Sequence, residues 1–270
     1  MLPLWPRKRT HRALLAALLA ITVTATVPAI ASAVTPDPTP GTRSSAPTTR
    51  ARAAAEPTPA GLRLAVNERG RISRSISAVA GQDATGSTLT VQKPAGATVR
   101  KAYLATATTG FTGTPLSTPL QIDGTAFPLG DATATGISSY NYFADVTSLV
   151  KPKVDAAATG AVDLTITEPE PGLTDGEIVV VVFDDPAVRI ERTVSILFGA
   201  LQPSGDTYGI QLARPISLAE TATQLEMSLG ISYSYQANGT PQFTTVDVDG
   251  RRLTSAAGGE DDGYSANGGL

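Results

Sequence analysis

The stretch GEIVVVVFDDP, residues 176–186, decides the fold class. Its apolar residues run from Ile178 to Phe183 and stop at two aspartates and a proline. A short run that is apolar on both faces is typical of a strand in the middle of a sheet, covered on both sides. Pro186 fixes its φ and lacks an N–H, and an Asp side chain can accept backbone N–H bonds. We therefore expect a central strand that ends in a turn at Asp184 and Asp185.

Strict alternation of apolar and polar residues predicts further strands. In AVDLTITE, Val162, Leu164 and Ile166 are expected to point inward; in VSILF, we expect Val194, Ile196 and Phe198 to follow Ile190 inward. The stretch QLEMSLGISYSY alternates in the same way from Leu225 to Tyr235. Other strands are expected at about 72–79, 87–92, 99–108, 207–212 and 243–248.

Two Asp-Gly pairs, Asp123-Gly124 and Asp249-Gly250, lie between such runs and predict tight type I′ hairpins, because both residues tolerate positive φ. Helical periodicity is confined to a short turn near residues 148–150. The pattern predicts an all-β fold, an antiparallel β-sandwich of immunoglobulin-like or jelly-roll-like type. A division into two small β domains is the alternative.

Three segments are expected along the chain. Residues 1–33 have a basic head, an apolar centre and an Ala31-Ser32-Ala33 cleavage site, which is typical of a secretory signal peptide and too short to span a bilayer. Residues 34–60 are rich in Pro, Thr and Ala and predict a disordered linker. Residues 61–270 form the β domain. Its last residues resemble the start of another strand, so we expect the chain to stop inside its domain.

The composition excludes several kinds of chemistry. The one His, His11, and the one Trp, Trp5, lie in the predicted signal peptide, and the chain has no Cys. Nucleophile systems that need His or Cys, imidazole or thiolate zinc sites and disulfides are therefore excluded from the exported chain. Without the four basic residues of residues 1–33, that chain has 17 basic and 24 acidic residues, a net charge of −7. Nucleic acid is therefore not expected as a partner.

Acidic clusters are the remaining candidates for chemistry. The strand end at Asp184-Asp185 resembles a Walker B motif, but the chain lacks the Gly-Lys pair of a phosphate-binding loop. If calcium is bound, the expected ligands are carboxylates of the strand end and of the GGEDDG segment: Asp184, Asp185, Glu260, Asp261 and Asp262. Glu168 and Glu170 are too close in sequence for a glycosidase pair and are expected to be solvated loop charges. No catalytic residue is predicted.

Four segments together resemble a family: VRKAYLATATTG, LQIDGTAF, YNYFADVTSLV and the stretch from Gly176 to Ala200. Their succession is similar to that of poorly characterised exported bacterial proteins with cell-surface or adhesin-like architecture. The resemblance covers roughly residues 66–270. Ala105-Thr106 stand where that pattern often has Tyr-Trp. The resemblance implies a β-sandwich and export, and it carries no catalytic residue over to this chain.

These observations predict a secreted or cell-surface protein, wall-associated or free, that acts in structure or adhesion without catalysis. Its expected partner is an extracellular protein or a glycan, with no membrane span once the signal peptide is removed. Two alternatives stay open: a calcium-assisted carbohydrate-binding module, and a hydrolase that depends on carboxylates.

Overall fold

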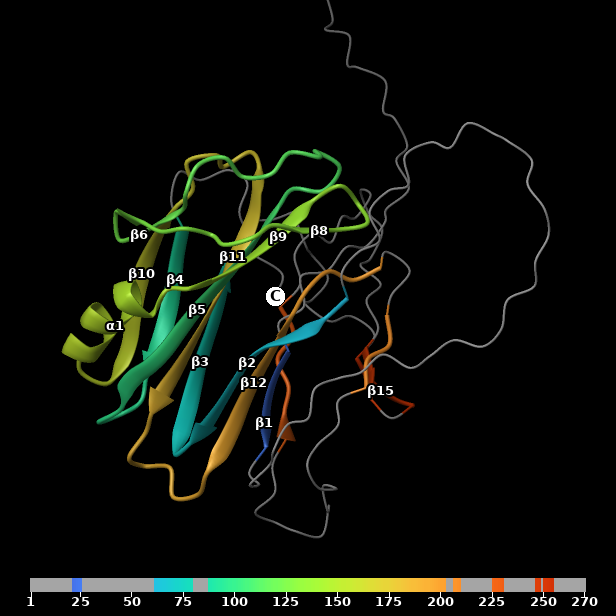
Figure 1. The fold of residues 1–270 in the computed structure, drawn as a ribbon. Helices are drawn as coiled ribbons and strands as arrows, with labels where there is room; N and C mark the ends of the chain where they lie inside the picture. Colours follow the sequence, from blue (N-terminus) through green and yellow to red (C-terminus); the bar gives the residue numbers. More distant parts are fainter. Residues whose placement is uncertain are drawn as a thin grey trace, which may run out of the picture.

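The computed structural model describes residues 21–25, 61–79, 87–202, 206–209, 225–230, 246–248 and 250–254. In these residues the chain forms antiparallel strands and a single short helix (Figure 1). Every pairing between the described strands is antiparallel, as the sequence predicts. No described helix has the length and apolarity that crossing a bilayer demands.

The strands fall into four sheets. The central sheet has the order β3 (Ile72–Val79), β11 (Thr174–Asp184), β5 (Thr98–Thr108), β9 (Tyr140–Asp145), β8 (Thr133–Ala134). A second sheet has the order β4 (Ser87–Lys93), β10 (Gly160–Thr167), β6 (Gln121–Ile122), β7 (Thr125–Ala126). A third has the order β13 (Leu225–Glu226), β1 (Ile21–Ala25), β12 (Arg192–Phe198), β2 (Arg63–Gly70), and β14 (Val246–Val248) pairs with β15 (Arg251–Thr254).

Strand β11 is covered on both faces, as its apolar run predicts. Val179, Val181 and Phe183 belong to the larger core, which they share with β4, β5, β10 and the helix. Ile178 and Val180 alternate with them and face a smaller core, where they meet Val66 of β2 and Ile196 of β12. Val182 continues this alternation and packs with Ile72 and Val194 in a third buried cluster. The central sheet is thus packed between two other sheets, and β11 contributes to both interfaces.

Serine side chains join the edges of the central and second sheets. Strand β4 is the edge of its sheet, and its Thr90 and Gln92 N–H groups point away from β10. The Thr90 N–H donates to Ser77 Oγ of β3 at 3.1 Å, and the Gln92 N–H donates to Ser75 Oγ at 2.9 Å. Because unpaired edge N–H groups are a site for unwanted strand pairing, these contacts also close that edge.

Helix α1 (Thr147–Ala156) packs against β5 (Figure 1). Val150 and Val154 are buried on its inner face. It is longer than the short turn that the sequence predicts. Pro152 and the two lysines that flank it interrupt the apolar pattern of a helix. The i, i+4 spacing of Val150 and Val154 nevertheless places both valines on one buried face.

Most strand predictions are confirmed in position. Val162, Leu164 and Ile166 are buried, and the hairpin at Asp123-Gly124 has positive φ at both residues, 48° and 79°. Strands β14 and β15 flank Gly250, as the second hairpin predicts.

Ile190 was predicted to be buried and is 48% exposed, because it lies in the connection before β12 begins. The strand expected from Leu225 covers only Leu225–Glu226 in the described residues; Met227 and Leu229 pack beside Leu62 and Leu197 without extending it. Residues 207–209 form no strand, and residues 210–212, 231–235 and 243–245 lie outside the described residues.

The predicted linker, residues 34–60, also lies outside the described residues, and so does the end of the chain. In the full chain, Ile21–Ala25 of the predicted signal peptide forms strand β1 beside β12. The signal peptide and the predicted domain limits stay predictions.

We expect Phe183→Ala to lower the free energy of unfolding by about 3–5 kcal/mol, because the ring is fully buried and its removal leaves a cavity. Ile190→Ala is the matched control and should change it by less than about 1 kcal/mol. Urea unfolding monitored by circular dichroism measures both. Equal effects of the two substitutions would contradict the observed packing.

Candidate functional site

Strand β11 ends at Asp184, and the turn that follows is held by the carboxylate of Asp185. Asp185 Oδ1 accepts a hydrogen bond from the Ala187 N–H at 2.9 Å, and its carbonyl oxygen accepts one from the Val188 N–H at 3.1 Å. The Asp185 N–H donates to the carbonyl of Arg71, next to β3. Asp185 therefore closes the turn that Pro186 and the sequence pattern predict.

Asp184 is paired with an arginine. Its Oδ1 accepts hydrogen bonds from Arg100 Nε at 2.8 Å and from the terminal Arg100 Nη2 at 2.5 Å. Arg100 also donates to the carbonyl of Arg69 and lies 3.7 Å from Glu68 Oε2. The guanidinium thereby ties β5 to the ends of β2 and β11. A side chain on Gly70 would be 2.8 Å from this guanidinium, so the backbone must come close here.

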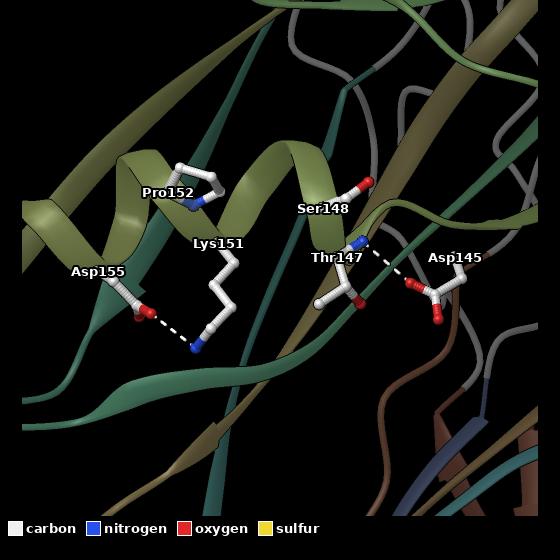
Figure 2. Close-up of a pocket in the computed structure, with 6 residues that line it drawn as sticks. All are labelled: Asp145, Thr147, Ser148, Lys151, Pro152 and Asp155. Atoms are coloured by element: carbon white, nitrogen blue, oxygen red, sulfur yellow. Dashed lines mark hydrogen bonds and ion pairs between the residues drawn. The ribbon is translucent and has the colours of Figure 1, made fainter.

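An open depression lies along α1, lined by helix residues from Thr147 to Asp155 and by Asp145 (Figure 2). Several of the side chains that line it form ion pairs or hydrogen bonds with the rest of the fold. Lys151 pairs with Asp155 at 2.7 Å, and Asp155 Oδ1 accepts the Val99 N–H. Asp145 Oδ1 accepts the Thr147 N–H at 2.9 Å, and its Oδ2 pairs with Lys101. The depression thus lies on the surface formed by α1 and the end of β9.

The structure separates Glu168 and Glu170, which were both expected to be solvated. Glu170 lies in the loop after β10, where its Oε1 accepts hydrogen bonds from the Ser117 N–H, the Ser117 hydroxyl and the Thr118 N–H. Partial burial opposes ionisation, but these hydrogen bonds prevail and lower the pKa of Glu170. Glu170 therefore holds the 117–118 segment in place rather than standing free in solvent.

The prediction for Glu168 is wrong. Glu168 is 2% exposed and Glu177 is 1% exposed, and their carboxyl groups face each other between the second sheet and the central sheet. None of their four carboxyl oxygens accepts a well-formed hydrogen bond. Packing alone does not explain this buried pair of carboxyl groups.

The environment favours the neutral form of both groups. Burial raises the pKa of Glu168 to about 7, although interactions with the side chains of Glu177 and Ser87 act in the opposite direction. Burial, together with the charges of Glu168 and Asp175, raises the pKa of Glu177 well above its ordinary range. Two carboxylates in one buried site cannot both ionise at low cost, so each group disfavours the ionisation of the other.

Sequence periodicity indicates that both glutamates lie on inward faces, although it does not report that they meet. Glu168 continues the alternation of the buried residues Val162, Leu164 and Ile166. Glu177 alternates in the same way with Val179, Val181 and Phe183, which face the larger core. The Pro residues around Glu168 suggested a solvated turn, but the alternation extends beyond the end of β10.

The candidate calcium ligands are not brought together by the described residues. Asp184 and Asp185 have the partners given above, and Glu260, Asp261 and Asp262 lie outside the described residues. In the described part of the chain, no three acidic side chains are grouped so that they could hold a metal ion. Calcium binding therefore stays a prediction.

A carbohydrate-binding module would need aromatic side chains at the surface, but Tyr140 and Phe143 are only half-exposed, and Tyr264 lies outside the described residues. Tyr142 is buried, and its hydroxyl accepts the Leu116 N–H. Phe143 packs on Tyr103 and Phe198, with ring centroids 5.5 and 5.1 Å apart. Phe111, which sequence reasoning missed, is 53% exposed and has a φ of 65°.

Comparison of the chain with protein-family models, with curated proteins and with solved structures finds no match.

We predict that Asp185→Ala lowers the free energy of unfolding by about 1 kcal/mol, because the Ala187 N–H loses its acceptor. Asp185→Asn keeps an acceptor oxygen and removes the charge, so it should stay within about 0.5 kcal/mol of the parent. Urea unfolding in EDTA and in calcium measures both. A calcium-dependent loss in the Asn variant would instead indicate that the carboxylate binds a cation.

Proposed function

We propose that this chain is a secreted or cell-surface protein that serves in structure or adhesion and binds an extracellular protein or glycan without catalysing a reaction. The leader-like residues 1–33, the Pro- and Thr-rich segment after them and the β-rich domain support export and display. The resemblance to exported bacterial surface proteins agrees with this proposal.

The observation that carries the proposal is that the acidic side chains named next form ion pairs with basic side chains of the fold. Asp184 pairs with Arg100, Asp145 with Lys101, Asp155 with Lys151, and Asp123 with Lys153. Each pair joins two segments of the fold or stabilises α1. A hydrolase built on carboxylates needs two of them to converge on a substrate-sized cleft. Glu168 and Glu177 do converge, but inside the protein and away from solvent.

The geometry also supports a display role for the scaffold. Two cores hold the central sheet on both faces, and the serine contacts close the edge between β3 and β4. A rigid scaffold positions exposed loops for binding without reorganisation, which lowers the entropic cost of association. The segment from Phe111 to Leu116, which follows β5, is an exposed loop of this kind.

The test is a binding assay with the chain from Val34 onward, labelled and applied to bacterial cell walls, extracellular matrix proteins and a glycan array. We expect saturable binding to one class of surface component, unchanged by EDTA and without turnover of the bound component. Asp184→Asn combined with Asp185→Asn is the matched control and should bind equally well. Binding to a glycan that requires calcium would favour the carbohydrate-binding module, and turnover would favour the hydrolase.

A further inference from the structure

The unexplained feature of the fold is the buried carboxyl pair between the two sheets of the larger core. Glu168 follows the last residue of β10 in the second sheet, and Glu177 lies in β11 of the central sheet. Both side chains are withdrawn from solvent, and all four carboxyl oxygens lack a well-formed hydrogen bond. Two bare carboxylates in this position would repel each other across the interface that the rest of the core holds together.

We propose that Glu168 and Glu177 share one proton and act as a latch between β10 and β11, which loosens this end of the domain when the proton is lost. A carboxylic acid donates one O–H, so protonation of either group supplies the donor that both lack and halves the buried charge. Loss of the proton leaves two unpaired charges in a dry site.

The surroundings of the pair favour a proton over a metal ion. Calcium takes about six to eight oxygen ligands, and among the described residues no group of three acidic side chains is placed so that it could hold a metal ion. The neighbours that act on the pair are the Ser87 hydroxyl at the start of β4, the Thr106 hydroxyl of β5 and the Asp175 carboxylate of β11. Thr106 already donates its hydroxyl hydrogen to the Gly176 carbonyl at 2.9 Å. Asp175 adds negative charge, which strengthens retention of the proton.

The backbone beside the latch is suited to local opening. The pairing of β11 with β5 is shifted between Thr174 and Glu177, so the ladder is interrupted next to Glu177. Beyond that point the two segments keep the pairing between Thr174 and Thr108 and one hydrogen bond from the Thr109 N–H to the Leu173 carbonyl. A short pairing beyond an irregularity has few contacts that resist separation, so we expect this end to open before the middle of the sheet does.

The direction of the pH effect follows from proton binding. In the unfolded chain each carboxyl ionises near its ordinary pKa of 4.5, while burial raises the pKa of Glu168 to about 7 and that of Glu177 well above its ordinary range. Above about pH 4.5 the folded chain therefore holds more protons than the unfolded chain, and stability falls as the pH rises through 7. The latch is closed under acidic conditions and opens under alkaline ones.

The test follows the thermal midpoint of the full chain from about pH 5 to about pH 8.5, in EDTA. We expect the parent midpoint to fall by about 3 °C or more over this range. Glu168→Gln combined with Glu177→Gln has no proton to lose and keeps the shape of the side chains, so its midpoint should change far less. Glu170→Gln is the matched control: the pKa of Glu170 is lowered, so its removal should leave the alkaline decline of the parent intact.

Carbon-13 NMR of labelled glutamate carboxyls provides a second measurement that does not depend on the stability of the variants. A carboxyl resonance that titrates near pH 7 in the parent, and is missing from either single Gln variant, supports the latch. A parent in which all glutamates titrate near pH 4.5 would overturn it. So would recovery of the alkaline midpoint on addition of calcium to the parent but not to the double variant, which would make the pair a cation site.

Discussion

The burial of β11 on both faces is the constraint on which the rest of the structure depends. Alternate residues of this strand enter two different cores, so its sequence must be apolar at every position from Ile178 to Phe183. Such a strand is stable only where sheets lie on both sides of it. The second sheet with α1 covers one face, and β2 with β12 covers the other. The second sheet and the pair β2 and β12 are therefore placed where they cover this strand.

Polar side chains lie at both ends of β11, where the strand is no longer covered on both faces. The two ends differ in how their charged groups are paired. At the carboxyl end, Asp184 is half-exposed and meets Arg100, an ion pair that solvent screens and that contributes modestly to stability. At the amino end, Glu177 stays inside and meets another carboxyl instead of a cation. A charge pair at one end and a shared proton at the other make the two ends respond differently to pH, although they belong to one strand.

Much of the fold could be predicted because period-two patterns report directly on which face of a strand is buried. This holds for β10, for β11 and for the hairpin at Asp123 and Gly124, where the turn chemistry is local. The position of Ile190 could not be predicted, because its exposure depends on where β12 begins. The same applies to the limits of α1, whose helix is stabilised by packing on β5 rather than by helix-favouring residues.

The candidate site was harder to predict for a physical reason. Sequence reasoning assigned Asp185 to a turn correctly, since that role needs only neighbouring residues, whereas Asp184 is the last residue of β11 and pairs with the distant Arg100. The pairing of Glu168 with Glu177 arises from two sheets meeting face to face, and no local rule reports on that. Whether a glutamate that follows an inward series is buried or turns outward depends on the partner sheet.

Amide hydrogen exchange under native conditions tests the central role of β11 most directly. If both cores are built on this strand, the amides of Val179 to Val182 should be among the slowest in the chain and should exchange only on global unfolding. Exchange of these amides as fast as those of β14 and β15 would contradict the account, because it would mean that one of the two covering sheets separates from β11 without unfolding the rest.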